Sequence, residues 1–133
     1  MKEFMMIFRN EKNENAEPPS QEQMQAVMKQ WQTWIKSIAQ KGHFSSTNRL
    51  LSEGKTLKSN QSVSDGPYAE VKEVVGGYLN VKADSLEQAI ELAKGCPGLQ
   101  MGSTVEVRAV MNIDANPDSR NFLDEVKLKE LVS

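Results

Sequence analysis

Cysteine and histidine are almost absent from this sequence of 133 residues, which contains one of each. The single cysteine, Cys96, cannot form an intramolecular disulfide bond. Together with the single histidine, His43, it does not supply the ligands of a typical zinc site. We therefore expect neither a disulfide framework nor a metal centre, and the sequence indicates no other cofactor.

The sequence also lacks a strong excess of either charge and any long apolar run. Sixteen basic and eighteen acidic residues give a net charge of -2, so no global field attracts nucleic acid or anionic lipid. No apolar segment approaches the roughly 20 residues that span a bilayer, and the N-terminal residues lead directly into a strand-like segment. We therefore expect a cytoplasmic protein without direct contacts to nucleic acid or to a membrane.

The sequence does contain enough apolar residues for one hydrophobic core. The hydrophobic fraction is 38% and the charged fraction is 26%, which is ordinary for a globular domain of this length. We predict one domain over residues 1–112, followed by a C-terminal extension over residues 113–133. Apolar residues in the extension are compatible with a short helix, namely Phe122, Val126 and Leu131.

The first segment, residues 3–9, is typical of a central strand because both of its alternating faces are apolar. The residues are Phe4, Met6 and Phe8 on one face and Met5 and Ile7 on the other. A polar stretch then leads to a predicted helix. Ser20 and Gln23 have the spacing of a capping box, and Gly42 provides a stop. The apolar stripe of this helix consists of Met24, Val27, Met28, Trp31, Trp34, Ile35 and Ile38.

Further strands and a second helix follow. Residues 55–59 suggest an edge strand that bends into an irregular connection, and residues 74–82 have the alternation of a strand. Residues 105–110 alternate as a last strand. Between residues 74–82 and 105–110 lies a helix capped by Asp84 or Ser85. Its apolar stripe consists of Leu86, Ala89, Ile90 and Ala93. Gly95 and Pro97 end this helix.

The predicted order is strand, helix, two strands, helix, strand. This is the ferredoxin-like βαββαβ arrangement, an α+β fold with an antiparallel sheet and both helices on one face. The other face is left open, although the first strand is apolar on that side as well. A second copy of the same sheet is the economical cover for such a face. The pattern therefore predicts a homodimer.

Residues 65–73 (DGPYAEVKE), followed by Gly76 and Gly77, resemble the signature of the YCII-related (DGPF-motif) family. Tyr68 stands where that motif usually has phenylalanine. Further segments resemble the family in the right order, namely residues 2–5 (KEFM), 28–31 (MKQW) with Trp34, 96–97 (CP) and 105–108 (VEVR). The resemblance spans about residues 2–110.

The resemblance implies a dimeric α+β barrel similar in fold to muconolactone isomerase, with a cavity against the sheet of each subunit. It implies no settled reaction, because the family consists mainly of uncharacterised proteins, some of them encoded beside or fused to sigma factors. Catalysis has been proposed for the family from the fold and from a pair of histidine and aspartate. Asp65 occupies the position of that aspartate, whereas residues 28–38 of the first helix contain no histidine.

Asp65 permits two interpretations. As a general base at the mouth of a cavity it would need a partner that tunes its pKa, and Arg9 and Arg108 are the candidates. Alternatively, its side chain folds onto the backbone two residues further on, and Gly66 and Pro67 set the direction of the chain as it enters a strand.

The strand alternation predicts a polar cluster on the open face. If the valines of the last strand face the helices, then Glu106 and Arg108 point the other way, and Tyr78 and Asn80 join them. We predict that the cluster binds a small organic acid, since an arginine fork suits a carboxylate. The predicted ligand-binding residues are Arg9, Tyr68, Tyr78 and Arg108. Alternatively, Glu106 forms an ion pair with Arg108 or with a second subunit.

Two classes of function follow. In the first, the protein binds a small polar or anionic metabolite and transfers a proton, with Asp65 as the base and Arg108 holding the substrate. In the second, it is a non-catalytic dimeric module that binds a small molecule or a regulatory partner such as a sigma factor. The missing histidine weakens the first interpretation. The missing basic patch weakens direct DNA contact in the second.

Overall fold

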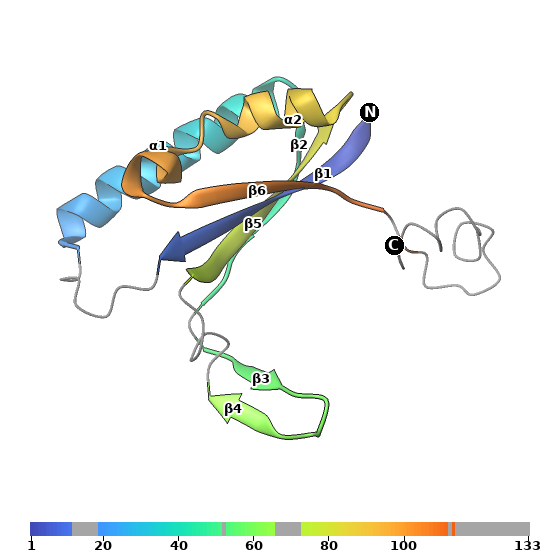
Figure 1. Ribbon diagram of the computed structural model, residues 1–133. Helices are drawn as coiled ribbons and strands as arrows, with labels where there is room; N and C mark the ends of the chain where they lie inside the picture. The colour runs from blue at the N-terminus through green and yellow to red at the C-terminus, as the bar shows by residue number, and fades with distance from the viewer. Residues whose placement is uncertain (12–18, 52, 66–72, 112, 114–133) are drawn as a thin grey trace.

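The computed structural model describes residues 1–11, 19–51, 53–65, 73–111 and 113. In these ranges two helices cover one face of a four-stranded sheet, and a separate hairpin projects from the opposite side (Figure 1). The elements are β1 (Lys2–Glu11), α1 (Gln21–Gln40), β2 (Phe44–Arg49), β3 (Lys55–Leu57), β4 (Val63–Asp65), β5 (Glu73–Ala83), α2 (Leu86–Ala93), the 3-10 helix η1 (Pro97–Met101) and β6 (Thr104–Ala109).

The four-stranded sheet has the order β2-β5-β1-β6, and all neighbouring strands are antiparallel. Strand β5 therefore lies between β2 and β1, the two strands that α1 connects, and β1 lies between β5 and β6, which α2 connects. This confirms the predicted ferredoxin-like α+β fold. It also confirms that the first apolar segment forms a central strand.

The prediction of an edge strand within residues 55–59 is wrong for the main sheet. The edge strand beside β5 is β2, whose sequence FSSTNR is polar after its first residue. Residues 55–57 form β3, which pairs only with β4 in a two-stranded sheet of its own. An edge strand that is covered little on either face needs few apolar side chains, so its sequence carries no clear hydrophobic alternation.

The hydrophobic core lies between the main sheet and the helices. The buried side chains are Phe4, Met6, Phe8, Trp34, Ile38, Leu79, Val81, Ala83, Ala89, Ala93 and Cys96. Three of them, Phe4, Met6 and Phe8, form one of the two apolar faces predicted for β1. Val105 and Val107 of β6 pack against the same core, so the even-numbered residues of β6 point to the open face, as the alternation predicted.

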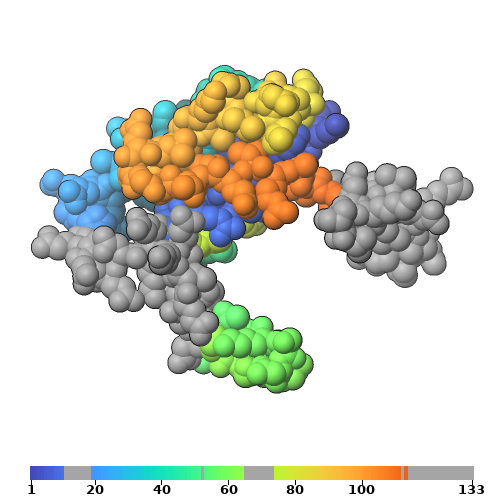
Figure 2. All heavy atoms as spheres, in the orientation of Figure 1, coloured from blue at the N-terminus to red at the C-terminus, as the bar shows by residue number. Residues whose placement is uncertain are grey.

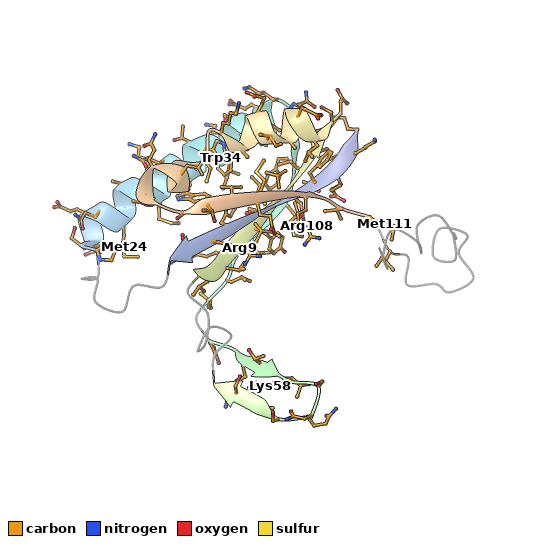
Figure 3. The ribbon with its side chains drawn as sticks, in the orientation of Figure 1. Arg9, Met24, Trp34, Lys58, Arg108 and Met111 are labelled. Atoms are coloured by element: carbon orange, nitrogen blue, oxygen red, sulfur yellow. The ribbon has the colours of Figure 1, made fainter. Side chains whose placement is uncertain are left out.

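Helix α1 begins with the predicted capping box, in which Ser20 and Gln23 exchange hydrogen bonds between side chain and backbone. Only the C-terminal part of its apolar stripe is buried. Met24 and Met28 are each 45% exposed, and Met24 lies at the end of α1 that extends beyond the sheet (Figure 3). A helix of 20 residues is about 30 Å long, which exceeds the length of the edge strands beneath it.

Helix α2 is capped by Ser85, one of the two predicted residues, whose Oγ accepts a hydrogen bond from the Gln88 backbone.

No helix in the described ranges is long and apolar enough to cross a membrane. The helix predicted within the C-terminal extension lies outside the described residues. Figure 2 shows how the two helices and η1 together form one continuous layer over the sheet.

Candidate functional site

The face of the main sheet that the helices leave open carries two rows of side chains across its strands. In the first row Met5 lies between Asn80 of β5 and Arg108 of β6, and Ser46 of β2 lies beyond Asn80. The Asn80 Nδ2 donates a hydrogen bond to Ser46 Oγ at 3.0 Å. The Asn80 Oδ1 is buried and accepts no hydrogen bond from the described residues. Buried acceptors are nearly always paired, so this oxygen has hydrogen-bonding capacity that the described residues leave unused.

The second row is one step further along the strands. Ile7 lies between Tyr78 of β5 and Glu106 of β6, and Asn48 of β2 lies beyond Tyr78. The Asn48 Nδ2 donates a hydrogen bond to Tyr78 Oη at 2.6 Å. Since the hydroxyl oxygen serves as the acceptor in this bond, the proton of Tyr78 is still available for another acceptor.

The predicted ion pair of Glu106 forms, but with Arg9 rather than Arg108. The distance from Arg9 Nη2 to Glu106 Oε2 is 3.6 Å, and the two side chains are 36% and 44% exposed. Such an exposed pair contributes little to stability, about 0–1 kcal/mol. The pair matters more for the charge of the site. Arg9 neutralises the carboxylate of Glu106, whereas Arg108 makes no ion pair in the described part of the chain. Both arginines lie at the sheet, away from the helix layer (Figure 3).

The pair Gly76 and Gly77 shapes the end of this face near Arg9. Pairing between β1 and β5 passes from Phe8 opposite Gly77 to Arg9 opposite Val75, so Gly76 is the extra residue of a β-bulge. A Cβ on Gly77 would lie 2.7 Å from the carbonyl oxygen of Asn48. Gly76 therefore forms a bulge and Gly77 permits a close backbone approach, the two structural roles that a glycine within a strand usually has.

Asp65 and Tyr68 were also predicted to belong to the site. The backbone of Asp65 ends β4 and pairs with Lys55, and the hairpin of β3 and β4 projects from the side of the main sheet opposite the helices (Figure 1). The side chain of Asp65 and the whole of Tyr68 lie outside the described residues. Their roles in binding or catalysis stay predictions.

The contacts of His43 and the burial of Cys96 indicate structural roles for both residues. The His43 Nδ1 lies 2.7 Å from the carbonyl oxygen of Lys82, to which it donates a hydrogen bond, so the ring ties the end of α1 to β5. Cys96 is only 3% exposed, and desolvation raises the pKa of its thiol above the ordinary value. In the described ranges, no three cysteine, histidine or acidic side chains come together as metal ligands would.

Two members of the cluster, Ser46 and Asn48, were missed by the sequence analysis because β2 was not recognised as a strand. Their spacing of two residues would have placed them on one face once the strand was known. The sequence alone also contains no sign that Glu106 selects Arg9.

The model of the YCII-related domain matches residues 3–114. The match covers well over half of the chain, and the protein belongs to the YCII-related family. This agrees with the motif of residues 65–73. No curated protein matches the chain.

Proposed function

We propose that the protein is a homodimer that binds a small organic acid on the open face of its sheet, with the second copy enclosing the ligand. The observation that carries the proposal is the position of Arg108. Its guanidinium has no acidic partner among the described residues, and it stands beside the apolar side chains of Met5 and Ile7. A free guanidinium next to apolar surface suits an organic anion.

Support for the dimer comes from β1. Met5 and Ile7 are half-buried on the open face, although neither of the helices in the described ranges covers that side. A central strand that presents apolar side chains on both faces favours a cover on both faces. A second copy supplies such a cover through the same surface on each subunit.

Sedimentation velocity tests the dimer. We expect the wild type to sediment as a dimer and Ile7→Lys as a monomer, because a lysine on the open face would place a charge in the interface. Ile90→Lys is the matched control, since Ile90 is 41% exposed on α2, on the helix side of the sheet. A monomeric wild type, or a dimer that survives Ile7→Lys, would contradict the proposal.

A thermal-shift titration with small carboxylates tests the ligand. We expect Arg108→Gln to weaken binding by roughly ten- to a hundredfold, which is the range for hydrogen bonds to a charged group. Arg49→Gln is the matched control, because the register of β2 places Arg49 opposite Gly77, on the side of Leu79 and the core. Equal binding by wild type and Arg108→Gln would refute a role for Arg108.

Proton transfer by Asp65 is the second part of the proposal. If Asp65 contacts the bound acid, stabilisation by that acid should change in Asp65→Asn, whereas an aspartate that only makes a turn would leave the shift unaltered. The same titration therefore separates a role at the ligand from a role in the turn.

A further inference from the structure

We propose that the bound acid is a hydroxy acid, with its carboxylate on Arg108 and its hydroxyl group between Asn80 and Tyr78. This inference rests on the proposed function and specifies the chemical class of the ligand. It is carried by the hydrogen-bonding capacity that is left over on β5.

The first part of that capacity is an acceptor. The Asn80 amide uses its Nδ2 to donate to Ser46 Oγ, and its buried Oδ1 has no donor among the residues that the structure describes. A buried carbonyl oxygen in this state favours any ligand that brings an O–H or N–H group to it.

The second part is a donor. Tyr78 is two residues before Asn80 on β5, so both side chains lie on the same face of the sheet. Because Tyr78 Oη accepts the hydrogen bond from Asn48, its proton is free to be donated to a ligand. An acceptor and a donor thus come from two residues of β5 that share this face.

A hydroxyl group uses both at once. It donates its proton to Asn80 Oδ1 and accepts the proton of Tyr78 on its oxygen. An ammonium group has no acceptor and a ketone has no donor, so each would leave one of the two protein groups unpaired. The chemistry of this end therefore favours a hydroxyl over an ammonium group or a ketone.

The distance to the other end sets the shape of the ligand. Asn80 and Arg108 flank Met5, one strand away on each side, so their Cα atoms are separated by two strand spacings, roughly 10 Å. The apolar side chain of Met5 lies between them. A short carbon chain that joins the hydroxyl and the carboxylate would cross this apolar surface.

Two matched series of acids test the inference on the full-length protein. The first series runs from 3-hydroxypropanoate to 6-hydroxyhexanoate, and the second, from butanoate to heptanoate, has a methyl group in place of each hydroxyl. Dissociation constants are measured by NMR titration. For the best chain length we expect the hydroxy acid to bind roughly tenfold more tightly than its methyl counterpart, the value of one hydrogen bond to an unpaired group.

Variants assign this preference to its residues. It should disappear in Asn80→Leu, weaken in Tyr78→Phe, and persist in Gln32→Leu, which removes an exposed amide on α1. Tyr78→Phe retains the aromatic ring and serves as the second variant if Asn80→Leu does not fold.

The outcomes separate this inference from the proposed function. Equal binding of the two series, with affinity lost in Arg108→Gln, would overturn the hydroxy acid while leaving the binding of an organic acid intact. A preference that survives both Asn80→Leu and Tyr78→Phe would also overturn it. If no acid of either series binds below about 10 mM, a very weak affinity, both proposals fail.

Discussion

The indole Nε1 of Trp34 donates a hydrogen bond to the carbonyl oxygen of Leu92 at 3.1 Å, which ties α1 to the last turn of α2. The contact depends on the absence of a side chain at Gly95, just after α2, because a Cβ there would lie 2.9 Å from the same nitrogen. A tryptophan and a glycine that are distant in the sequence therefore hold the helix layer together over the sheet.

Trp34→Phe should lower the free energy of unfolding by about 1–3 kcal/mol, because the carbonyl oxygen of Leu92 loses its partner and the ring becomes smaller. Urea unfolding followed by circular dichroism measures the change. Trp31→Phe is the control, since Trp31 packs edge-to-face on Phe8 at 4.9 Å but makes no indole hydrogen bond in the described part of the chain. Equal losses in the two variants would show that the hydrogen bond contributes nothing.

The two neighbouring glycines of β5 should respond differently to alanine. In Gly77→Ala the new Cβ meets a backbone oxygen, that of Asn48 at 2.7 Å, so the edge strand must shift, at a cost of about 1–3 kcal/mol. In Gly76→Ala the nearest atom, also at 2.7 Å, is the Asn10 Nδ2, the end of an exposed side chain that can move at the cost of its hydrogen bond from Ser103 Oγ. Thermal unfolding of both variants checks the order, and the reverse order would contradict the described geometry.

The same substitution at two leucines should separate the core from the hairpin. Leu79 is fully buried, whereas Leu57 is 65% exposed in β3. We expect Leu79→Ala to destabilise the protein by about 2–5 kcal/mol and Leu57→Ala by no more than about 0.5 kcal/mol. Chemical denaturation measures both. A large loss in Leu57→Ala would indicate that the hairpin packs against another surface in solution.

The buried thiol should make stability depend on pH in the alkaline range. Desolvation raises the pKa of Cys96 above its ordinary value of 9.0, so the unfolded chain loses this proton at a lower pH than the folded protein does. The stabilisation is therefore complete below about pH 9 and is lost as pH rises through the folded pKa.

Unfolding measured from pH 8 to 10.5 in wild type and Cys96→Ala tests this, because the difference between them isolates the thiol from the lysines and tyrosines. The wild type should lose more stability than Cys96→Ala over this range. Parallel curves would contradict the expectation. Slow alkylation of the native thiol by iodoacetamide, with rapid reaction in urea, would provide a second measure of its burial.

Elements with a regular hydrophobic period could be predicted closely from the sequence. The alternation of β1 and the capping box of α1 each depend on residues within a few positions of one another. Such patterns are local, and the physical rules that link them to structure are local as well.

The edge strand β2 could not be predicted in this way. Its serines, threonine and asparagine acquire a strand conformation by pairing with β5, about 30 residues further along the chain. Nothing within the segment FSSTNR favours a strand strongly, so tertiary pairing decided its structure.

The sequence also determined which side chains belong to the open face, because alternation along β5, β1 and β6 places Tyr78, Ile7 and Arg108 together. Only the tertiary structure decided how they are paired. Arg9 pairs with Glu106, and Ser46 accepts a hydrogen bond from the Asn80 Nδ2. Within the described ranges, Arg108 has no acidic partner and the Asn80 Oδ1 accepts no hydrogen bond. Partner choice among several polar groups depends on distances of a few tenths of an ångström across strands, and no spacing along the chain encodes them.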